Sequence, residues 1–307
     1  FSGPLAGLAN ATLGSMPVRI AMEKALGISR RRTLPAFAKQ PFTSWFENRV
    51  APANSSGGEV VLFNDTWNTY NTPQVAIAAT EVLEAAGLTV TLPGHGCCGR
   101  PMISKGLLDD ARLAALDTVN RLAPLAERGL PIVGLEPSCI LTLRDEYHYL
   151  LPHDPRVDLI AERAFTFEEF LARLQAGQQL DLRLSDQPRQ LLLHGHCHEK
   201  ALVGTGPSHT TLSLPPGYHV SEIDSGCCGM AGAFGYEAEH YEISLKMAER
   251  VLLPAVRDAD ADTAIVASGI SCRQQIEHGT GRLALHPAEV LRQALISSSE
   301  TEVHHAD

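Results

Sequence analysis

Positive charge is scarce in this chain of 307 residues. Lysine and arginine together number 25 against 35 aspartates and glutamates, which gives a formal net charge of −10. A protein that binds nucleic acid along its phosphate backbone needs a basic face, and basic segments are likewise what an anionic membrane surface attracts. The composition therefore argues against nucleic acid and against a membrane surface as partners.

Long apolar runs are absent as well, although 44% hydrophobic residues are enough to build a core. A membrane-spanning helix needs about 18 to 20 consecutive apolar residues. The most apolar N-terminal stretch, residues 4–28, is interrupted by the polar or charged side chains Asn10, Arg19, Glu23 and Lys24. No basic segment leads into an apolar run with a cleavage site, so we expect no secretory signal. We predict a cytoplasmic protein without a transmembrane segment, either free or held at the inner membrane by a partner. Because the chain begins at Phe1, we also expect a fragment of a longer polypeptide.

The cysteines lack the spacings of common metal sites. Neither Cys-x-x-Cys-x-x-Cys nor paired Cys-x-x-Cys motifs occur, so the usual ferredoxin and zinc-ribbon patterns are missing. The seven cysteines are an odd number, and four of them form two adjacent pairs, Cys97–Cys98 and Cys227–Cys228. This arrangement is poorly suited to a secreted domain held by disulfides. We therefore expect reduced thiols in a cytoplasmic setting.

An internal repeat is present instead. The sequence Gly-Cys-Cys-Gly occurs at residues 96–99 and again at 226–229, a spacing of 130. At the same spacing the apolar run 61–63 falls on 191–193, and at a spacing of 133 Cys139 falls on Cys272. Each copy has two strand-like runs, the cysteine pair, a long helix, a third run, a single cysteine and a closing helix. The sequence therefore predicts a duplicated module.

Periodicity and punctuation predict the elements of each copy. Apolar residues at helical spacing predict helices over 73–87, from 107 to 129 and over 237–251. Short apolar runs predict strands at 61–63, 88–92, 132–135, 191–193 and 264–267. Strands that alternate with amphipathic helices are typical of mostly parallel sheets flanked by helices. The predicted fold class is α/β, with two repeated modules.

The predicted organisation has four parts. Residues 1–57 form a linker or docking segment, with the basic triplet 30–32 on a solvated face and a flexible joint at 54–58. The first module spans 58–180 and the second 188–297, separated within the polar stretch 175–189. Residues 298–307 form a flexible tail.

All seven cysteines follow strand-like runs. In parallel sheets the loops beyond the carboxyl ends of the strands are where ligands bind. We therefore predict that the cysteine loops gather there and bind a cofactor. The second module contributes the expected metal ligands Cys197, Cys227, Cys228 and Cys272, and the first contributes Cys97, Cys98 and Cys139.

Four thiols on three loops suit a soft metal centre. Adjacent cysteines reach different irons of a cluster more easily than one zinc ion, and the flanking glycines allow close approach of the backbone. An iron–sulfur cluster is favoured, while zinc, another metal and metal-free thiol chemistry stay open. His194, His196 and His198 could tune a cluster, carry protons or simply belong to a polar loop. Lys200 and Arg100 could stabilise a thiolate or be ordinary surface charges.

Two Cys-Cys-Gly motifs, each followed about forty residues later by a cysteine, resemble the cysteine-rich CCG domain pair. Such pairs are found in heterodisulfide reductase, in the lactate-utilisation iron–sulfur protein and in anaerobic glycerol-3-phosphate dehydrogenase, within one subunit of each reductase or dehydrogenase complex. From about residue 58 to 296 the chain is also similar to the C-terminal part of bacterial FAD-linked oxidases of the D-lactate or D-2-hydroxyglutarate dehydrogenase type. The motifs that carry this resemblance are residues 63–66, 95–101, 134–139, 194–198, 224–232 and 271–276.

The resemblance implies an iron–sulfur electron-transfer portion of an FAD-linked oxidoreductase. It would relay electrons from a flavin that oxidises a D-2-hydroxy acid to a downstream acceptor. A 4Fe-4S cluster would sit on this chain, whereas FAD and the substrate site would lie outside it. The implied partners are flavin-binding and ferredoxin-like domains of the same polypeptide or complex. A zinc-bound or metal-free docking module and thiol–disulfide chemistry are the alternatives.

The chain departs from the fullest family motif, which has a leading cysteine, the adjacent pair and a closing Cys-x-x-Cys. Trp67 stands at the 130-residue spacing from Cys197, so the first copy lacks the leading cysteine. Glu136 and Gly269 replace the first cysteine of the two closing motifs. We therefore expect a single cluster on the second copy. In the first copy, Trp67 or its neighbours Asn64 and Asp65 would fill the space of the missing thiol. Both cysteine sets should lie on one side of the molecule, near the interface between modules.

Overall fold

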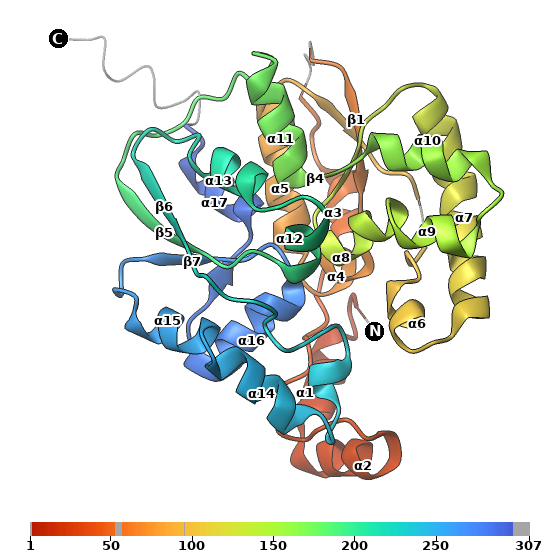
Figure 1. Cartoon of the computed structure of the whole chain (residues 1–307), viewed down its shortest axis with the longest axis vertical. Helices are drawn as coiled ribbons and strands as arrows, with labels where there is room; N and C mark the ends of the chain where they lie inside the picture. Colours follow the sequence, from red (N-terminus) through yellow and green to blue (C-terminus); the bar gives the residue numbers. More distant parts are fainter. Residues whose placement is uncertain (1, 53–56, 95, 297–307) are drawn as a thin grey trace.

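Two four-stranded sheets, each entirely parallel, form the centre of the structure, a computed structural model that describes residues 2–52, 57–94 and 96–296 (Figure 1). The first sheet has the order β2 (Thr89–Thr91), β1 (Glu59–Phe63), β3 (Ile132–Gly134), β4 (Ala164–Thr166). The second has the order β6 (Tyr218–Glu222), β5 (Arg189–Leu193), β7 (Ala264–Val266), β8 (Ala284–Leu285). The predicted α/β class is confirmed. The predicted tail 298–307 and residues 54–56 of the predicted joint lie outside the described residues.

Helices flank both sheets. Those of the first module are α4 (Thr66–Tyr70), α5 (Pro73–Ala85), α6 (Arg100–Ser104), α7 (Leu108–Glu127), α8 (Pro137–Ile140), the 3-10 turn η1 (Leu141–Leu143), α9 (Glu146–Leu150), α10 (Pro155–Arg163) and α11 (Phe167–Ala176). Those of the second are α12 (Cys197–Leu202), α13 (Gly206–Leu212), η2 (Phe234–Tyr236), α14 (Tyr241–Glu249), α15 (Leu252–Asp258), α16 (Ile270–Thr280) and α17 (Pro287–Ala294). Among the described helices, none is long and apolar enough to cross a lipid bilayer.

The two sheets repeat each other strand for strand. The central strands have the same register: Phe63 at the end of β1 pairs with Gly134, and Leu193 at the end of β5 pairs with Val266. Each sheet also has a short edge strand, β4 or β8, that the sequence did not predict. Because equivalent strands end at the same level, the loops that follow them occupy equivalent places in the two modules.

One predicted helix was too long. The region predicted to be helical over 237–251 begins only at Tyr241, and α14 ends at Glu249. Pro254 then lies in the first turn of α15. Proline cannot donate the backbone hydrogen bond of a helix interior and clashes with the carbonyl four residues earlier, which here belongs to Arg250. The chain therefore breaks between the two helices and restarts at Leu252.

The modules share a hydrophobic core. Helix α5 packs against α17, α11 packs against α13, and α13 packs against α17, so helices of both modules meet between the two sheets (Figure 1). The buried side chains of α5, such as Val75 and Val82, belong to the same cluster as Ala288 and Leu291 of α17. This shared packing sets the position of one set of cysteine loops relative to the other.

The N-terminal segment has helical structure and contacts both modules. It forms α1 (Ala6–Gly14), α2 (Met16–Leu26) and α3 (Phe42–Asn48). Phe42 is buried in the core beside α5. Arg32 is also buried, at 2% exposure, and donates hydrogen bonds to the carbonyl of Gly235 and to Oγ of Ser244, both at 2.8 Å. The expectation of a solvated basic triplet is therefore wrong for this arginine, because the second module provides acceptors for its guanidinium.

Candidate metal centre

The second module brings its four cysteines together at the carboxyl ends of its strands. Cys197 is the first residue of α12, directly after the loop that follows β5, and Cys272 is the third residue of α16, after β7. Cys227 and Cys228 lie in the loop after β6. Their thiols form a chain of hydrogen-bonded contacts from Cys197 to Cys227, then to Cys228 and then to Cys272. All seven cysteines are free thiols.

These contacts favour two thiolates in the chain of four. Hydrogen bonds from Cys197 and Cys228 lower the pKa of Cys227 to about 2. The hydrogen bond from Cys228 likewise lowers the pKa of Cys272 well below its usual value. The two donors have raised pKa values because each gives its proton to a neighbouring sulfur. Soft metal ions bind thiolates, so half of the ligand set is already in the binding form.

The glycine of the Cys-Cys-Gly motif is required by the close packing of this loop. Gly229 has a φ of +86°, and a Cβ there would lie 2.3 Å from the carbonyl oxygen of Ser244 on α14. Its backbone N–H also donates to Sγ of Cys227, at 3.3 Å. Glycine therefore lets the loop lie against α14 while its amide stabilises negative charge on the sulfur.

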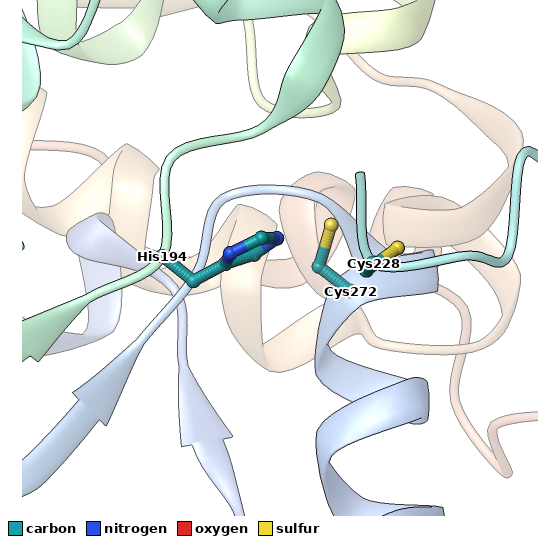
Figure 2. Close-up of side chains that lie close together, drawn as sticks. All are labelled: His194, Cys228 and Cys272. Carbon is teal, nitrogen blue, oxygen red and sulfur yellow. The ribbon is translucent and has the colours of Figure 1, made fainter. Parts of the chain in front are cut away.

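A histidine lies beside the buried end of the thiol chain. A ring nitrogen of His194 and the sulfur atoms of Cys228 and Cys272 all lie within 4.8 Å of one another, and all three residues are buried. Figure 2 shows the imidazole, which projects from the end of β5, pointing toward the two sulfur atoms. The other nitrogen, Nδ1, lies 2.8 Å from Oγ of Ser225.

The next histidine fills the place of a lost cysteine. A Cβ on Gly269 would lie only 2.4 Å from Cδ2 of His196. His196 caps α12, where its Nδ1 accepts a hydrogen bond from the backbone of His198 at 3.2 Å. Because Gly269 replaces the first cysteine of the closing motif, the absent side chain and the imidazole ring occupy complementary space.

The first module arranges its three cysteines in the same way. Cys98 contacts both Cys97 and Cys139, and Cys139 is the third residue of α8, as Cys272 is of α16. Cys97 also makes a hydrogen bond with Thr66. Thr66 is the first residue of α4, the place that Cys197 has in α12.

The expectation that Trp67 or its neighbours Asn64 and Asp65 fill the space of the missing thiol is therefore wrong: Thr66 contacts Cys97 as Cys197 contacts Cys227. The loop after β1 is one residue shorter than the loop after β5, so a constant spacing of 130 aligns Cys197 with the wrong residue. Asp65 caps α4 through the backbone N–H of Asn68, and burial raises the pKa of its carboxyl to about 6.

The two cysteine sets meet at the interface between modules. Helix α8 contacts α12, and Glu136, which caps α8, accepts a hydrogen bond from the backbone N–H of Ile270 at 2.8 Å. A second oxygen of Glu136 accepts from Oγ of Ser138 at 2.7 Å and lies 3.9 Å from Nε2 of His196. The glutamate that replaces one lost cysteine therefore reaches the helix that carries Cys272.

The basic residues near the cysteine loops are held by carboxylates. Lys200 pairs with Glu222 at 3.1 Å and donates to the carbonyl of Ser225 at 2.9 Å. Arg100 pairs with Glu146. Sequence reasoning missed Thr66, Glu136 and Arg32, because their roles depend on loop length and on contacts between distant segments.

Comparison with known proteins agrees with this geometry. The family model described as "Cysteine-rich domain" (CCG) matches residues 63–144, within the first module. The third subunit, by letter, of anaerobic glycerol-3-phosphate dehydrogenase from Escherichia coli is 30% identical over 296 residues, which cover 96% of this chain and 74% of that protein. The chain belongs to the CCG cysteine-rich family that includes this dehydrogenase subunit.

Other CCG relatives match a smaller part of the chain. D-2-hydroxyglutarate dehydrogenase of Escherichia coli is 28% identical over 246 residues, 78% of this chain but only 23% of that much longer protein. Lactate utilization protein A of Bacillus subtilis is 26% identical over 230 residues, 71% of this chain and 92% of that protein. The predicted resemblance to CCG-containing parts of dehydrogenases is confirmed.

Proposed function

We propose that this chain is the iron–sulfur electron-transfer component of an FAD-linked dehydrogenase, with one 4Fe-4S cluster held by Cys197, Cys227, Cys228 and Cys272. The observation that carries the proposal is the continuous contact of these four thiols at the carboxyl ends of three strands. When bound, the cluster would accept and release single electrons, while the protein positions it and sets its potential.

The residues present fit a sulfur-ligated centre. Cys228 and Cys272 are buried, Cys227 is half-buried and Cys197 is exposed, so the site runs from the module interior to the surface. Two sulfurs are stabilised as thiolates, and a buried imidazole lies next to the inner pair. A centre with one ligand at the surface is accessible to the cofactor of a partner, as an electron relay requires.

The names of the relatives support the electron source. Glycerol 3-phosphate, D-2-hydroxyglutarate and lactate each carry a hydroxyl group on the carbon that a dehydrogenase oxidises. We propose that a flavin in another domain or subunit takes two electrons from a D-2-hydroxy acid and passes them singly to this chain. A ferredoxin-like domain and a downstream acceptor would complete the path, in the cytoplasm or at the inner membrane through a partner.

Anaerobic reconstitution tests this proposal. The purified chain should contain about four irons and about four acid-labile sulfides, and should give a cluster EPR signal on reduction. Cys228→Ser should abolish most of this content, whereas Cys98→Ser in the first module should leave it unchanged. A reconstituted wild-type chain with neither iron nor sulfide contradicts the proposal, and stoichiometric zinc in their place would support the docking alternative.

Thiol–disulfide chemistry is a second candidate, because the lowered pKa of Cys227 would make this partly exposed cysteine a reactive nucleophile. Brief alkylation of the metal-free chain followed by mass spectrometry distinguishes the two. Selective modification of Cys227, together with a Cys227–Cys197 or Cys227–Cys228 disulfide on mild oxidation, is expected for the thiol enzyme. Uniformly slow modification contradicts it.

A further inference from the structure

We infer that His194 is a fifth protein ligand of the second-module centre and binds its metal through Nε2, an inference that rests on the proposed cluster site. His194 is the residue that directly follows β5 and is fully buried. Its ring lies against Cys228 and Cys272, the two buried thiols of the four (Figure 2).

The partner of Nδ1 sets the tautomer. The hydroxyl of Ser225 has one hydrogen, which it donates to the carbonyl of Ile223 at 3.5 Å. Its oxygen therefore accepts from Nδ1–H of His194, at 2.8 Å. With the proton held on Nδ1, the lone pair of Nε2 is free and the ring is oriented. A hydrogen bond from the second ring nitrogen is the usual support of a histidine that binds metal.

Nε2 has no other use in the described part of the chain. It is buried and makes no hydrogen bond with any described residue. An unpaired buried polar atom costs about 1–3 kcal/mol, so such atoms are rare without a functional reason. A metal bound to the neighbouring sulfurs would meet this lone pair and remove the cost.

The other two histidines of this loop are engaged elsewhere. Nδ1 of His196 caps α12 and its ring fills the space in front of Gly269. The imidazole of His198 lies with Asp145 and Glu146 of the first module. Of the three, only His194 directs a free nitrogen at the thiols.

The repeat gives independent support. Asn64 directly follows β1, as His194 follows β5, and its Oδ1 is also buried and unpaired among the described residues. The position after the central strand therefore directs an unpaired atom inward in both modules. An imidazole is a good ligand for iron, whereas an amide oxygen suits harder ions, so only the second module places a ligand for a soft metal there.

Pulsed EPR on the anaerobically reconstituted chain, labelled with nitrogen-15 histidine, tests the inference directly. The paramagnetic cluster should show a strongly coupled nitrogen in the wild type and in the matched control His196→Gln, and His194→Gln should lose it. His194→Cys, which offers a thiolate instead, should bind as much iron as the wild type but also lack the nitrogen coupling. A cluster signal without strong nitrogen coupling in the wild type, or coupling that persists in His194→Gln, overturns the inference.

Cobalt binding separates this test from the proposed function. If the wild type forms no iron–sulfur cluster, the proposed function fails, but Co²⁺ titration of the metal-free chain still reports the ligand set through thiolate-to-cobalt absorption. His194→Gln should bind Co²⁺ about tenfold more weakly or worse, with His196→Gln close to wild type. Equal Co²⁺ affinity in wild type and His194→Gln, with both folded by circular dichroism, overturns the inference whatever the fate of the cluster.

Discussion

The backbone N–H of Ile270 donates a 2.8 Å hydrogen bond to Oε2 of Glu136, which joins the first residue of α16 to the cap of α8 in the other module. Glu136 is 3% exposed, and its charge faces the fully buried guanidinium of Arg273. Arg273 directly follows Cys272, so the first module contributes charge and orientation to the centre of the second.

Replacing Glu136 separates these two contributions. Glu136→Gln keeps an acceptor for Ile270 but removes the negative charge, so we expect a small loss of stability and a more positive cluster potential in an EPR-monitored redox titration. Glu136→Ala should also lose about 1–3 kcal/mol of unfolding free energy, because a buried N–H is left unpaired. Glu59→Gln, at the opposite end of β1, is the control. If Glu136→Gln has the potential of this control, the glutamate has no electrostatic role at the centre.

The position of Thr66 predicts a gain of function. Since Thr66 has the place in α4 that Cys197 has in α12, Thr66→Cys should complete a second set of four thiols with Cys97, Cys98 and Cys139. We expect Co²⁺ binding by the metal-free chain to rise by about one ion per chain. Trp67→Cys, the position that the spacing of 130 selects, is the matched control and should bind no extra ion. Equal binding by the two variants would contradict the structural alignment.

Much of the fold and of the site follows from the sequence, and the exceptions have physical reasons. Local periodicity and the repeat predict the strands, and the convergence of Cys197 with Cys227 follows because parallel strands end at one edge of their sheet. A repeat spacing cannot reveal that one loop is a residue shorter, so Thr66 was missed. The burial of Arg32 could not be predicted either, because its acceptors lie more than 200 residues along the chain.

Arg32 should be important for stability, because it also supports the cysteine loop. Its guanidinium hydrogen-bonds the side-chain oxygen of Gln275, whose Nε2 donates to the carbonyl of Cys228 at 3.0 Å. We expect Arg32→Met to lower the free energy of unfolding by about 2–4 kcal/mol, since several buried acceptors lose their donor. Urea unfolding followed by circular dichroism measures this. Arg30→Met, at an exposed position of the same triplet, should change it by less than about 0.5 kcal/mol. Similar values for the two variants would show that the buried network adds nothing.

A buried glutamate should make stability depend on pH. Glu168 is 1% exposed at the start of α11, and burial, reinforced by the nearby charge of Glu199, raises the pKa of its carboxyl to about 8. The folded state therefore holds a proton that the unfolded state releases near the ordinary glutamate pKa of 4.5, so this group makes the protein less stable as the pH rises from about 4.5 to 8. Glu168→Gln removes that dependence. Its free energy of unfolding relative to wild type should increase steadily between pH 5 and about 8 and then level off, whereas the exposed Glu162→Gln should show a flat difference. A flat difference for Glu168→Gln as well would mean that the carboxyl is ionised in the folded protein at neutral pH.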